Sequence, residues 1–494
     1  MHVVFRADAS REMGSGHIMR CLTLADSLAA MGAQCSFAAR PGSQETVPAL
    51  AEAGYDLIRL EAAAADEAEE LRQHRPDGVD WLVVDHYGRD RTFEAACRPW
   101  ARGIMVLDDL ADRSHDCDLL LDQTLGRTTG DYGGLLPPAC RKLMGTRFAL
   151  LRPEFGKLRQ SRPRPAASPQ APLRLLVTLG GTDPDNLTGV CIDAIERSGI
   201  RADVDVVAGQ GFSSLPELRR RIESLAGHTL HVSPASMGEL MASADLAIGA
   251  AGTTSWERCC LGLPTVMLVL ADNQREIAKQ LSAVGAATVV DGQGGDLVEA
   301  ISAQLRHLDG DRAALQDMSL RASAVCDGQG ALRARLSFLP RQATKNGSGV
   351  FLRLAEADDE ATLLHWQQQP SIRALARNPE IPTEAEHRVW FAARMTSECS
   401  FITMIEHGDE VAGMLRLDRL EPTDQHEVLE VSIVVDDGHR GLGVGLAALK
   451  QIRAWMPEVE FRAETLPNNH PSIALFRAAG YRALEGNLLH STAA

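Results

Sequence analysis

Short apolar segments alternate with longer amphipathic segments from the first residue to about residue 335. The amphipathic segments repeat their apolar residues at helical spacing, as at Ile18–Met31 and Leu215–Ala226. This alternation is typical of parallel βαβ units. We therefore predict an α/β fold with strands at Val3–Phe5, Trp81–Val84, Ile104–Leu107, Leu175–Leu179, Val204–Val207, Leu246–Ile248 and Thr265–Leu270.

Two segments of low complexity interrupt this pattern. Gln160–Pro172 (QSRPRPAASPQAP) is rich in proline, which is excluded from a helix interior and from a central strand. Arg341–Gly349 (RQATKNGSG) has the polar, glycine-containing composition of a flexible linker. These segments predict three domains at about 1–158, 173–338 and 350–494. Two α/β lobes joined by a short linker also predict a ligand cleft between the first two domains.

Composition limits the partners of the chain. Its 494 residues exceed one ordinary hydrophobic core. A formal charge of −16 argues against a nucleic-acid partner, but loop amides and helix N-termini can still hold a phosphate-bearing small molecule. The sequence has no apolar run of the roughly 20 residues that span a bilayer, and its start predicts a strand, not a signal peptide. Ten scattered cysteines fit reduced thiols. We expect a cytoplasmic protein without a membrane partner, and the sequence leaves its oligomeric state open.

The loop after the first predicted strand carries candidate chemistry. It reads ADASREMGSGH and leads into an amphipathic helix. Gly14 and Gly16 permit a tight turn and close approach of a ligand. His17 stands at the positive end of the helix dipole, which favours a neutral ring that can accept a proton. Arg20 follows one turn later. The plainer alternative is an ordinary solvated or capping histidine. The loop matches neither a Walker A motif nor GxGxxG.

The second predicted lobe offers two turns that suit a diphosphate. One is GGTDPDN (Gly180–Asn186), and the other is GTTSWE (Gly252–Glu257), which opens a helix. Free amides and hydroxyls at such turns point at an anion. Glu257 lies one helical turn further, within reach of a ribose diol, and Asn273 stands at a later strand-to-helix loop. The alternative is that these are ordinary capped helices. The residues that we expect to contact the diphosphate are Gly180, Gly181, Gly252, Thr253 and Thr254.

Several strings in residues 1–338 resemble a known family. They are FRADAS, MGSGHIMRCLTLA, VVDHYGRD, LDDLADRSHDCDLLLDQT, GTRFALLRPEF, LVTLGGTDPDN and GAAGTTSWERCCLGLPTVML. In this order they resemble the UDP-sugar hydrolases of pseudaminic acid biosynthesis, which release UDP from 2,4-diacetamido-2,4,6-trideoxy-β-L-altropyranose. The resemblance implies a GT-B-like pair of Rossmann-type lobes, with UDP held by the second lobe.

Matched position by position, the resemblance also implies roles for individual residues. His17 would be the general base, with His86 as the competing candidate. Glu257 would hold the ribose. The remaining substrate-site residues would be Arg6, Asp8, Gly16, Tyr87 and Asn273, of which Arg6 and Asp8 shape the active-site loop. Water deprotonated by the base would attack the anomeric carbon and displace UDP with inversion, so no metal is required. The carboxylates of Asp108–Asp109, Asp116 and Asp118 read as solvated or capping groups.

Residues 350–494 carry a second set of motifs. The predicted strand Val428–Val435 leads into HRGLGVG, and Phe461–Tyr481 reads as strand, asparagine-rich turn and helix. This order resembles the GNAT N-acetyltransferases. The resemblance implies that acetyl-CoA is the cosubstrate and that Asn469 meets its pantetheine arm. The pyrophosphate would bind at Arg440, Gly441, Gly443 and Gly445.

The acetyltransferase pattern is incomplete at one position. Phe476 stands where many GNAT enzymes carry a tyrosine that protonates the departing thiolate. Water, or less directly Tyr481, must then supply that proton. Glu430, on the strand before the glycine loop, is a candidate base for the sugar ammonium, although an ordinary strand carboxylate explains it equally well.

The two halves together predict a bifunctional enzyme. Acetyl transfer to the 4-amino group of a UDP-linked sugar would make the substrate of the hydrolase. The sequence leaves three alternatives open: a GT-B glycosyltransferase using a UDP-sugar, a hydrolase and acetyltransferase pair for another diamino sugar, and a nucleotide-sugar sensor without catalysis.

Overall fold

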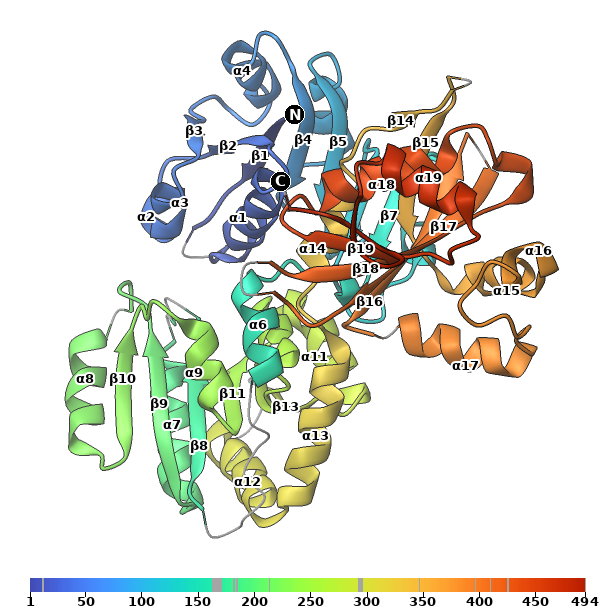
Figure 1. Cartoon of the computed structure of the whole chain (residues 1–494). Coiled ribbons are helices and arrows are strands. Elements are labelled where there is room, and N and C mark those ends of the chain that lie inside the picture. Colours follow the sequence, from blue (N-terminus) through green and yellow to red (C-terminus); the bar gives the residue numbers. More distant parts are fainter. Residues whose placement is uncertain are drawn as a thin grey trace. The chain divides into compact units, whose positions relative to one another are not determined.

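The computed structural model describes residues 1–10, 13–161, 171–180, 183, 185–212, 214–291, 296–345, 347–395, 397–408, 410–423 and 426–493. The chain divides into two compact units (Figure 1). The first unit comprises Met1–Ala29 with Ala33–Ala331, and the second comprises Ala30–Gly32 with Leu332–Ala494. Among the described residues, no helix combines the length and the apolar character needed to cross a membrane.

The first sheet of the first unit is parallel throughout, in the order β3-β2-β1-β4-β5-β6-β7. Its strand order reverses between β1 (His2–Ala7) and β4 (Val79–Asp85). This reversal is the topological switch point at which open α/β sheets bind ligands. The other strands are β2 (Gln34–Ala39), β3 (Asp56–Arg59), β5 (Ala101–Leu107), β6 (Leu119–Asp122) and β7 (Arg141–Met144). The helices are α1 (Gly16–Ala29), α2 (Ser43–Thr46), α3 (Pro48–Glu52), α4 (Glu67–His74) and α5 (Arg91–Cys97), with short 3-10 turns η1 (Thr129–Tyr132) and η2 (Thr146–Phe148). The helix α6 (Pro153–Ser161) follows in sequence and packs with helices of the second sheet.

The second sheet repeats this plan. It is parallel, in the order β10-β9-β8-β11-β12-β13, with its switch point between β8 (Leu173–Thr178) and β11 (Leu246–Ala250). The other strands are β9 (Ala202–Ala208), β10 (His228–Val232), β12 (Thr265–Val269) and β13 (Ala287–Asp291). The helices are α7 (Leu187–Ser198), α8 (Leu215–Ser224), α9 (Met237–Ser243), α10 (Thr254–Cys260), α11 (Arg275–Ala283), α12 (Leu297–Gly310) and α13 (Arg312–Val325), with the 3-10 turn η3 (Asp272–Gln274). The next helix, α14 (Gly330–Leu336), begins in the first unit, and its residues from Leu332 on belong to the second.

The second unit is built on a mixed sheet in the order β14-β15-β16-β17-β18-β19-β21-β20. Within it, β18 and β19 are parallel, and their ladder joins Val428–Glu430 to Glu460–Arg462. The strands are β14 (Gln342–Ala343), β15 (Gly349–Leu354), β16 (Ser400–His407), β17 (Glu410–Arg419), β18 (Val428–Val435), β19 (Glu460–Glu464), β20 (Arg482–Glu485) and β21 (Leu488–Ser491). The helices are α15 (Glu360–Gln368), α16 (Pro370–Arg373), α17 (Glu384–Met395), α18 (Val444–Trp455) and α19 (His470–Ala478), with the 3-10 turns η4 (Ala357–Asp359) and η5 (Asp437–His439).

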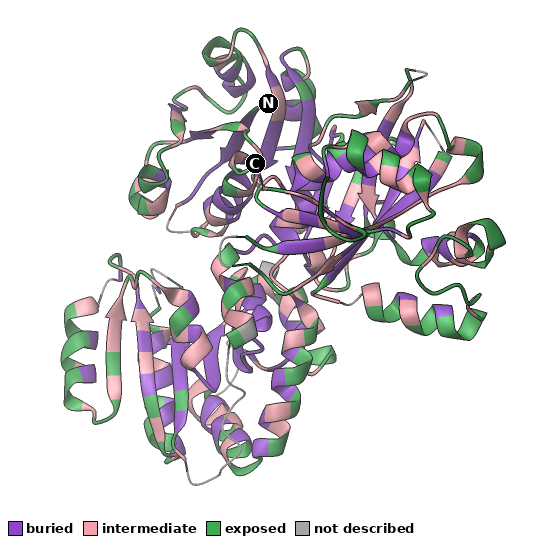
Figure 2. Cartoon of the chain, viewed as in Figure 1, coloured by how far each residue is buried: buried purple, intermediate pink, exposed green. Residues whose placement is uncertain are grey.

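Each sheet has its own apolar core, because the strands of the parallel sheets are covered by helices on both faces. In the first sheet the core includes Val4, Leu82 and Ile104, and in the second it includes Leu175 and Ile248. Figure 2 shows the strand centres buried and the outward helix faces exposed. The predicted fold class is confirmed: two Rossmann-type parallel lobes precede a mixed α/β domain.

The segment Arg341–Gly349, expected to be a flexible linker, is different in the structure. Gln342 and Ala343 form β14, which pairs antiparallel with β15. The Thr344 amide donates to the Ser348 carbonyl at 2.9 Å, which closes the turn. Its polar composition therefore reflects a hairpin turn instead of a free tether. Most of the other expected linker, residues 162–170, lies outside the described residues.

Candidate functional site

The switch point of the first sheet brings His17 and Asp85 together. Ala7, the last residue of β1, is in register with Asp85, the last residue of β4. The chain leaves β1 through the glycine loop and returns as α1, which carries His17 in its first turn. Both side chains are buried, and Asp85 has no exposed surface. The parallel pairing of two strands thus joins residues 68 positions apart.

Asp85 contacts both His17 and Arg20. Its Oδ1 lies 2.5 Å from His17 Nδ1, while Arg20 Nη2 and Nε donate to Oδ1 and Oδ2 at 2.6 Å each. An ionised carboxylate can only accept hydrogen bonds, so the proton of the neutral ring sits on Nδ1. Arg20 Nη2 also lies 3.3 Å from Nδ1, but the shorter carboxylate contact decides the tautomer. The lone pair of Nε2 is then the one available to take a proton from water.

The charges around this group keep Asp85 ionised. Burial by itself raises the pKa of Asp85, but Arg20 and His17 outweigh it and hold the pKa well below its usual range. Arg20 also pairs with Asp109 at 3.0 Å. Tyr87 packs edge-on against His17 with ring centroids 4.6 Å apart, and burial raises its pKa, so its hydroxyl stays a neutral donor.

His86, the competing base, has both ring nitrogens engaged. Its Nδ1 accepts a hydrogen bond from the Gly88 amide at 2.8 Å, so that nitrogen carries no proton. Its Nε2 lies 3.3 Å from Asp8 Oδ2 and donates to it. A histidine with its lone pair committed to the backbone cannot also activate water, which favours His17 over His86.

Arg6 and Asp8 belong to a buried ionic network beside this group. Arg6 has no exposed surface and bonds to Asp8 at 2.8 Å and to Glu67. Asp8 Oδ1 accepts from the Arg40 amide at 2.7 Å. Arg89 also pairs with Glu67, at 2.6 Å. These contacts suit the expected shaping of the active-site loop, whereas a direct contact of Arg6 with a substrate stays a prediction.

Within the first unit, the glycine loop lies against the turn after β11. A narrow cavity is lined by Gly16, Arg20, Gln123, Arg152, Thr253, Trp256, Glu257 and neighbouring residues. A Cβ atom added at Gly16 would lie 3.0 Å from Thr253 Oγ1. A side chain there would displace the threonine, so the sequence needs glycine at this close approach. The cavity joins the predicted base loop to the predicted diphosphate turn.

The turn after β11 presents hydroxyl groups that a buried arginine holds in place. Arg258, almost fully buried, donates to Thr254 Oγ1 at 3.3 Å, to Ser255 Oγ at 3.1 Å and to the Ala250 carbonyl at 2.7 Å. Thr253 occupies the N-cap position of α10, where its hydroxyl makes no capping bond among the described contacts. Burial lowers the pKa of Arg258 to about 10, which still leaves it cationic beneath the turn. An anion bound there would meet this charge.

Glu257 lines the same cavity and is unlike an ordinary surface carboxylate. Burial raises its pKa to about 7, against the opposing charges of Arg152 and Arg258. Near neutral pH it can therefore donate as well as accept a hydrogen bond. Gly180, two residues after the end of β8, is in the left-handed region, with φ of 106°. Gly181 lies outside the described residues, and for Asn273 the structure describes only its place in η3.

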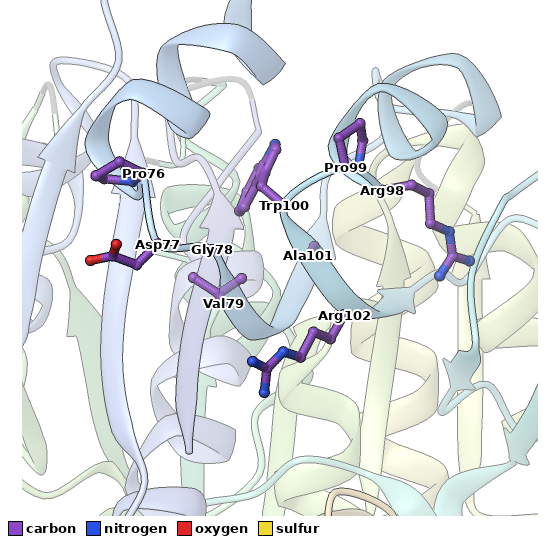
Figure 3. Close-up of a pocket in the computed structure, with 9 residues that line it drawn as sticks. All are labelled: Pro76, Asp77, Gly78, Val79, Arg98, Pro99, Trp100, Ala101 and Arg102. Atoms are coloured by element: carbon purple, nitrogen blue, oxygen red, sulfur yellow. The ribbon is translucent and has the colours of Figure 1, made fainter.

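A separate hollow opens at the amino ends of β4 and β5 (Figure 3). Asp77, Trp100 and Arg102 are among the residues that line it. Its arginines are already paired, Arg98 with Asp116 and Asp118, and Arg102 with Asp80. It also lies at the opposite end of the strands from His17, so we assign it no role in the chemistry.

In the second unit, the glycine loop lies between β18 and α18. Gly441 and Gly443 have φ of 78° and 92°, in the left-handed region that favours glycine. Gly443 is the N-cap residue of α18, and Gly445 sits in its first turn. Arg440 pairs with Asp437 at 2.7 Å, and its Nε donates to the Val435 carbonyl. The loop thus turns backbone amides toward the start of a twelve-residue helix.

The other candidate residues of this unit occupy different settings. Asn469 caps α19 by accepting from the Ser472 amide at 3.2 Å. Phe476 is buried against Tyr481, with ring centroids 5.0 Å apart. Burial raises the pKa of Tyr481, and its place in the apolar core favours water as the acid. Glu430 is partly buried and pairs with Arg377 at 2.7 Å.

Comparisons with known proteins agree with this division. Residues 361–481 match the family model described as the acetyltransferase (GNAT) family, and residues 176–329 match that of the glycosyltransferase family 28 C-terminal domain. The chain therefore joins a glycosyltransferase-28-type domain to a GNAT acetyltransferase domain.

Three curated relatives extend this result. An uncharacterised protein of Methanocaldococcus jannaschii is 21% identical over 98% of this chain and 97% of its own length. The UDP-2,4-diacetamido-2,4,6-trideoxy-β-L-altropyranose hydrolase of Campylobacter jejuni is 25% identical over 58% of this chain and 97% of its own length. A spore coat polysaccharide biosynthesis protein of Bacillus subtilis, SpsG, is 25% identical over 58% of this chain and 83% of its own length. The archaeal relative thus aligns with nearly the whole of this chain.

Sequence reasoning assigned no role to three residues of these sites. Asp85 stands directly before the quoted His86 and Tyr87, and its signal is a carboxylate that ends a buried strand. Arg258 lies four residues after Thr254, on the same face of α10. In the GNAT domain, Arg377 reaches Glu430 from a distant part of the sequence, and no local pattern announces that contact.

Proposed function

We propose that the first unit hydrolyses a UDP-sugar and that the GNAT domain N-acetylates the precursor of that sugar. The sugar is 2,4-diacetamido-2,4,6-trideoxy-β-L-altropyranose, the amine is the 4-amino group of its UDP-linked precursor, and the pathway is pseudaminic acid biosynthesis. The observation that carries the hydrolytic half is the contact of His17 with Asp85 and Arg20. The relative from C. jejuni supports the choice of sugar.

Hydrolysis follows from the free lone pair on His17 Nε2. This nitrogen takes a proton from water as the water oxygen attacks the anomeric carbon. The bond between that carbon and the phosphate oxygen breaks, UDP leaves with the bonding electrons, and the configuration inverts. Asp85 then faces an imidazolium and stabilises it. General-base assistance of this kind contributes roughly 10²- to 10⁴-fold in rate.

The second lobe would hold the leaving group. The hydroxyls of Thr253 and Thr254, with the charge of Arg258 beneath them, suit the diphosphate. Glu257 would bond the ribose hydroxyls. A leaving diphosphate gains negative charge as the bond breaks, so fixed donors at this turn favour the transition state over the bound substrate.

In the GNAT domain, acetyl-CoA would supply the acetyl group as a thioester. Glu430 would accept a proton from the sugar ammonium, and the free amine would attack the thioester carbonyl. An amide forms, the carbon–sulfur bond breaks, and the thiolate takes a proton from water. The amides of Gly441, Gly443 and Gly445 would hold the pyrophosphate of the cosubstrate, and Asn469 lies at the start of α19 for its pantetheine arm.

A second candidate function for the first unit is glycosyl transfer from a UDP-sugar. The match of residues 176–329 to a glycosyltransferase domain favours it. It differs from hydrolysis in one respect only: a sugar hydroxyl, not water, gives its proton to His17 and attacks the anomeric carbon. UDP release in the absence of any acceptor other than water separates the two.

The decisive experiment follows both steps in one tube. The full chain is incubated with the UDP-linked 4-amino sugar and acetyl-CoA, and products are identified by mass spectrometry and proton NMR. We expect N-acetylation first, then free sugar and UDP. His17→Ala should stop UDP release and leave acetylation intact, while His74→Ala, an exposed histidine on α4, should change neither step. Continued hydrolysis by His17→Ala would show that another group is the base.

A further inference from the structure

A row of polar side chains crosses the sheet of the second unit in register. Asp418 on β17 is paired with Glu430 on β18, and Glu430 is paired with Arg462 on β19. The row continues to Ser400 on β16 and to His490 on β21. Paired residues of neighbouring strands project from the same face of a sheet. All these side chains are therefore on one face.

This face is divided between an apolar part and the polar row. Apolar residues lie on the same face, two or four positions from the polar row along the same strands. They are Ile402, Met404, Met414 and Val434, and they pack in a cluster with α15 and α17. On the opposite face, Leu417, Leu429 and Phe461 lie in the core with α18. The polar row thus lies at the edge of the apolar cluster on this face. Its members are partly enclosed, with side-chain exposures of 15% for Asp418, 14% for Glu430 and 25% for Arg462.

Two arginines from the covering segments reach down to this row. Arg394 on α17 pairs with Asp418 at 2.7 Å. Arg377, between α16 and α17, pairs with Glu430 at 2.7 Å and with Glu464 at 2.9 Å. Asp418 also accepts from Ser400 and pairs with Arg416, so it is well satisfied. Arg377 is about half exposed. An ion pair of that exposure is weak.

The position of Glu430 adds a second observation. Glu430 is the last residue of β18 in the ladder with β19, although β18 runs on to Val435. In the described part of the chain, the two parallel strands part at this carboxylate. Beyond Glu430, the backbone groups of β18 that face β19 need other hydrogen-bond partners. The glycine loop begins where β18 ends. Glu430 is therefore the member of the polar row whose strand continues into the proposed cosubstrate loop.

We propose that Arg377 determines the amine specificity of the GNAT domain: its guanidinium occupies Glu430 in the free protein, and the ammonium group of a polyhydroxylated primary amine replaces it there. The guanidinium of Arg377 is a cation of the protein itself, and it occupies the position that the ammonium group of the ligand would take. Arg462 and His490, which follow Glu430 in the row, can form hydrogen bonds with sugar hydroxyls. This inference rests on the proposed function to the extent that the domain must acetylate an amine.

The test uses the full chain and measures CoA thiol release at varied amine and varied acetyl-CoA. The amines are the UDP-linked 4-amino sugar, glucosamine and the apolar amine phenylethylamine. The wild type should prefer both sugars to phenylethylamine. Glu430→Gln should raise KM for the amino sugars roughly tenfold or more, because a charge-assisted hydrogen bond is removed. It should also lower kcat, because an amide cannot take the proton of the ammonium, while KM for acetyl-CoA stays unchanged.

Arg377 gives the sharper test, since removal of a competitor improves binding. Arg377→Ala should lower KM for the amino sugars about two- to fivefold, the range of a weak ion pair, at unchanged kcat. Arg377→Lys should restore the wild-type KM. Arg388→Ala, an exposed arginine on α17 that pairs with Glu384, is the matched control and should have no effect.

The outcomes separate this inference from the proposed function. This inference alone is overturned if Arg377→Ala leaves the amine KM unchanged or raises it. It is also overturned if Glu430→Gln raises KM for acetyl-CoA but not KM for the amine. A wild-type preference for phenylethylamine overturns the choice of a polyhydroxylated amine. If the wild type acetylates none of the three amines, the acetyl-transfer half of the proposed function fails together with this inference.

Discussion

Replacing Asp85 by asparagine tests how the base is oriented. Asparagine has the size of aspartate but carries one acceptor oxygen and one NH₂ group. The carboxylate accepts from His17 and twice from Arg20, so an amide nitrogen must face one of these donors. His17 then loses the partner that fixes its tautomer, or Arg20 loses half of its bidentate contact.

The expected magnitude follows from the hydrogen bond that asparagine cannot accept. A hydrogen bond to a charged group is worth about 1.5–3 kcal/mol, which corresponds to a fall in kcat of roughly 10- to 150-fold for UDP release. Because Arg20 is buried and would keep its ion pair with Asp109 but not the one with Asp85, the variant should also be less stable. Removal of one partner from a buried pair costs about 3–5 kcal/mol.

The assay measures UDP release by chromatography, with CoA release as a control in the same sample. Acetylation should persist, since it resides in the other compact unit. The double variant Asp85→Asn with His17→Ala should be no slower than His17→Ala alone, because a residue that acts through another adds nothing once that residue is gone. Independent, multiplicative losses would refute the orienting role, as would full activity of Asp85→Asn in a folded sample.

Two further predictions concern the buried carboxyl group of Glu257 and the glycine loop before α18. Burial raises the pKa of Glu257 from 4.5 to about 7. The stability that the protein has with this carboxyl group neutral is therefore fully present below about pH 4.5, and it is lost as the pH rises through 7 and the buried group ionises. Glu257→Gln mimics the protonated form and should be more stable than wild type at pH 8 by about 1–3 kcal/mol. In thermal melts at pH 5.5 the gap should fall to less than half of that value, and an equal gap at both pH values would contradict the buried-carboxylate explanation. Gly443→Ala places a Cβ at φ of 92°, which costs about 1–2 kcal/mol, and should raise KM for acetyl-CoA several-fold while UDP release stays unchanged; an unaffected KM would remove this loop from the cosubstrate site.

The sequence by itself determined the fold class and the positions of the inner strands of both parallel sheets. Apolar runs such as Val3–Phe5 and Trp81–Val84 lie inside β1 and β4, and Val428–Val435 coincides with β18. These elements could be predicted because their signals are local: apolar periodicity, glycine turns and helix starts depend on neighbouring residues. The outer strands of these sheets, β2, β3, β6, β7, β10 and β13, escaped prediction, and all of them except β2 have only four or five residues.

Only the tertiary structure decided which chemical groups meet. His17 was recognisable from its loop, yet its partner Asp85 is set by the pairing of β1 with β4, and the engagement of His86 by Gly88 and Asp8 is visible only in space. The contact of Arg377 with Glu430 and the polar row across the sheet likewise depend on strand register. Hydrogen bonds and ion pairs act over a few ångströms, and chain folding, not sequence distance, determines which groups come that close.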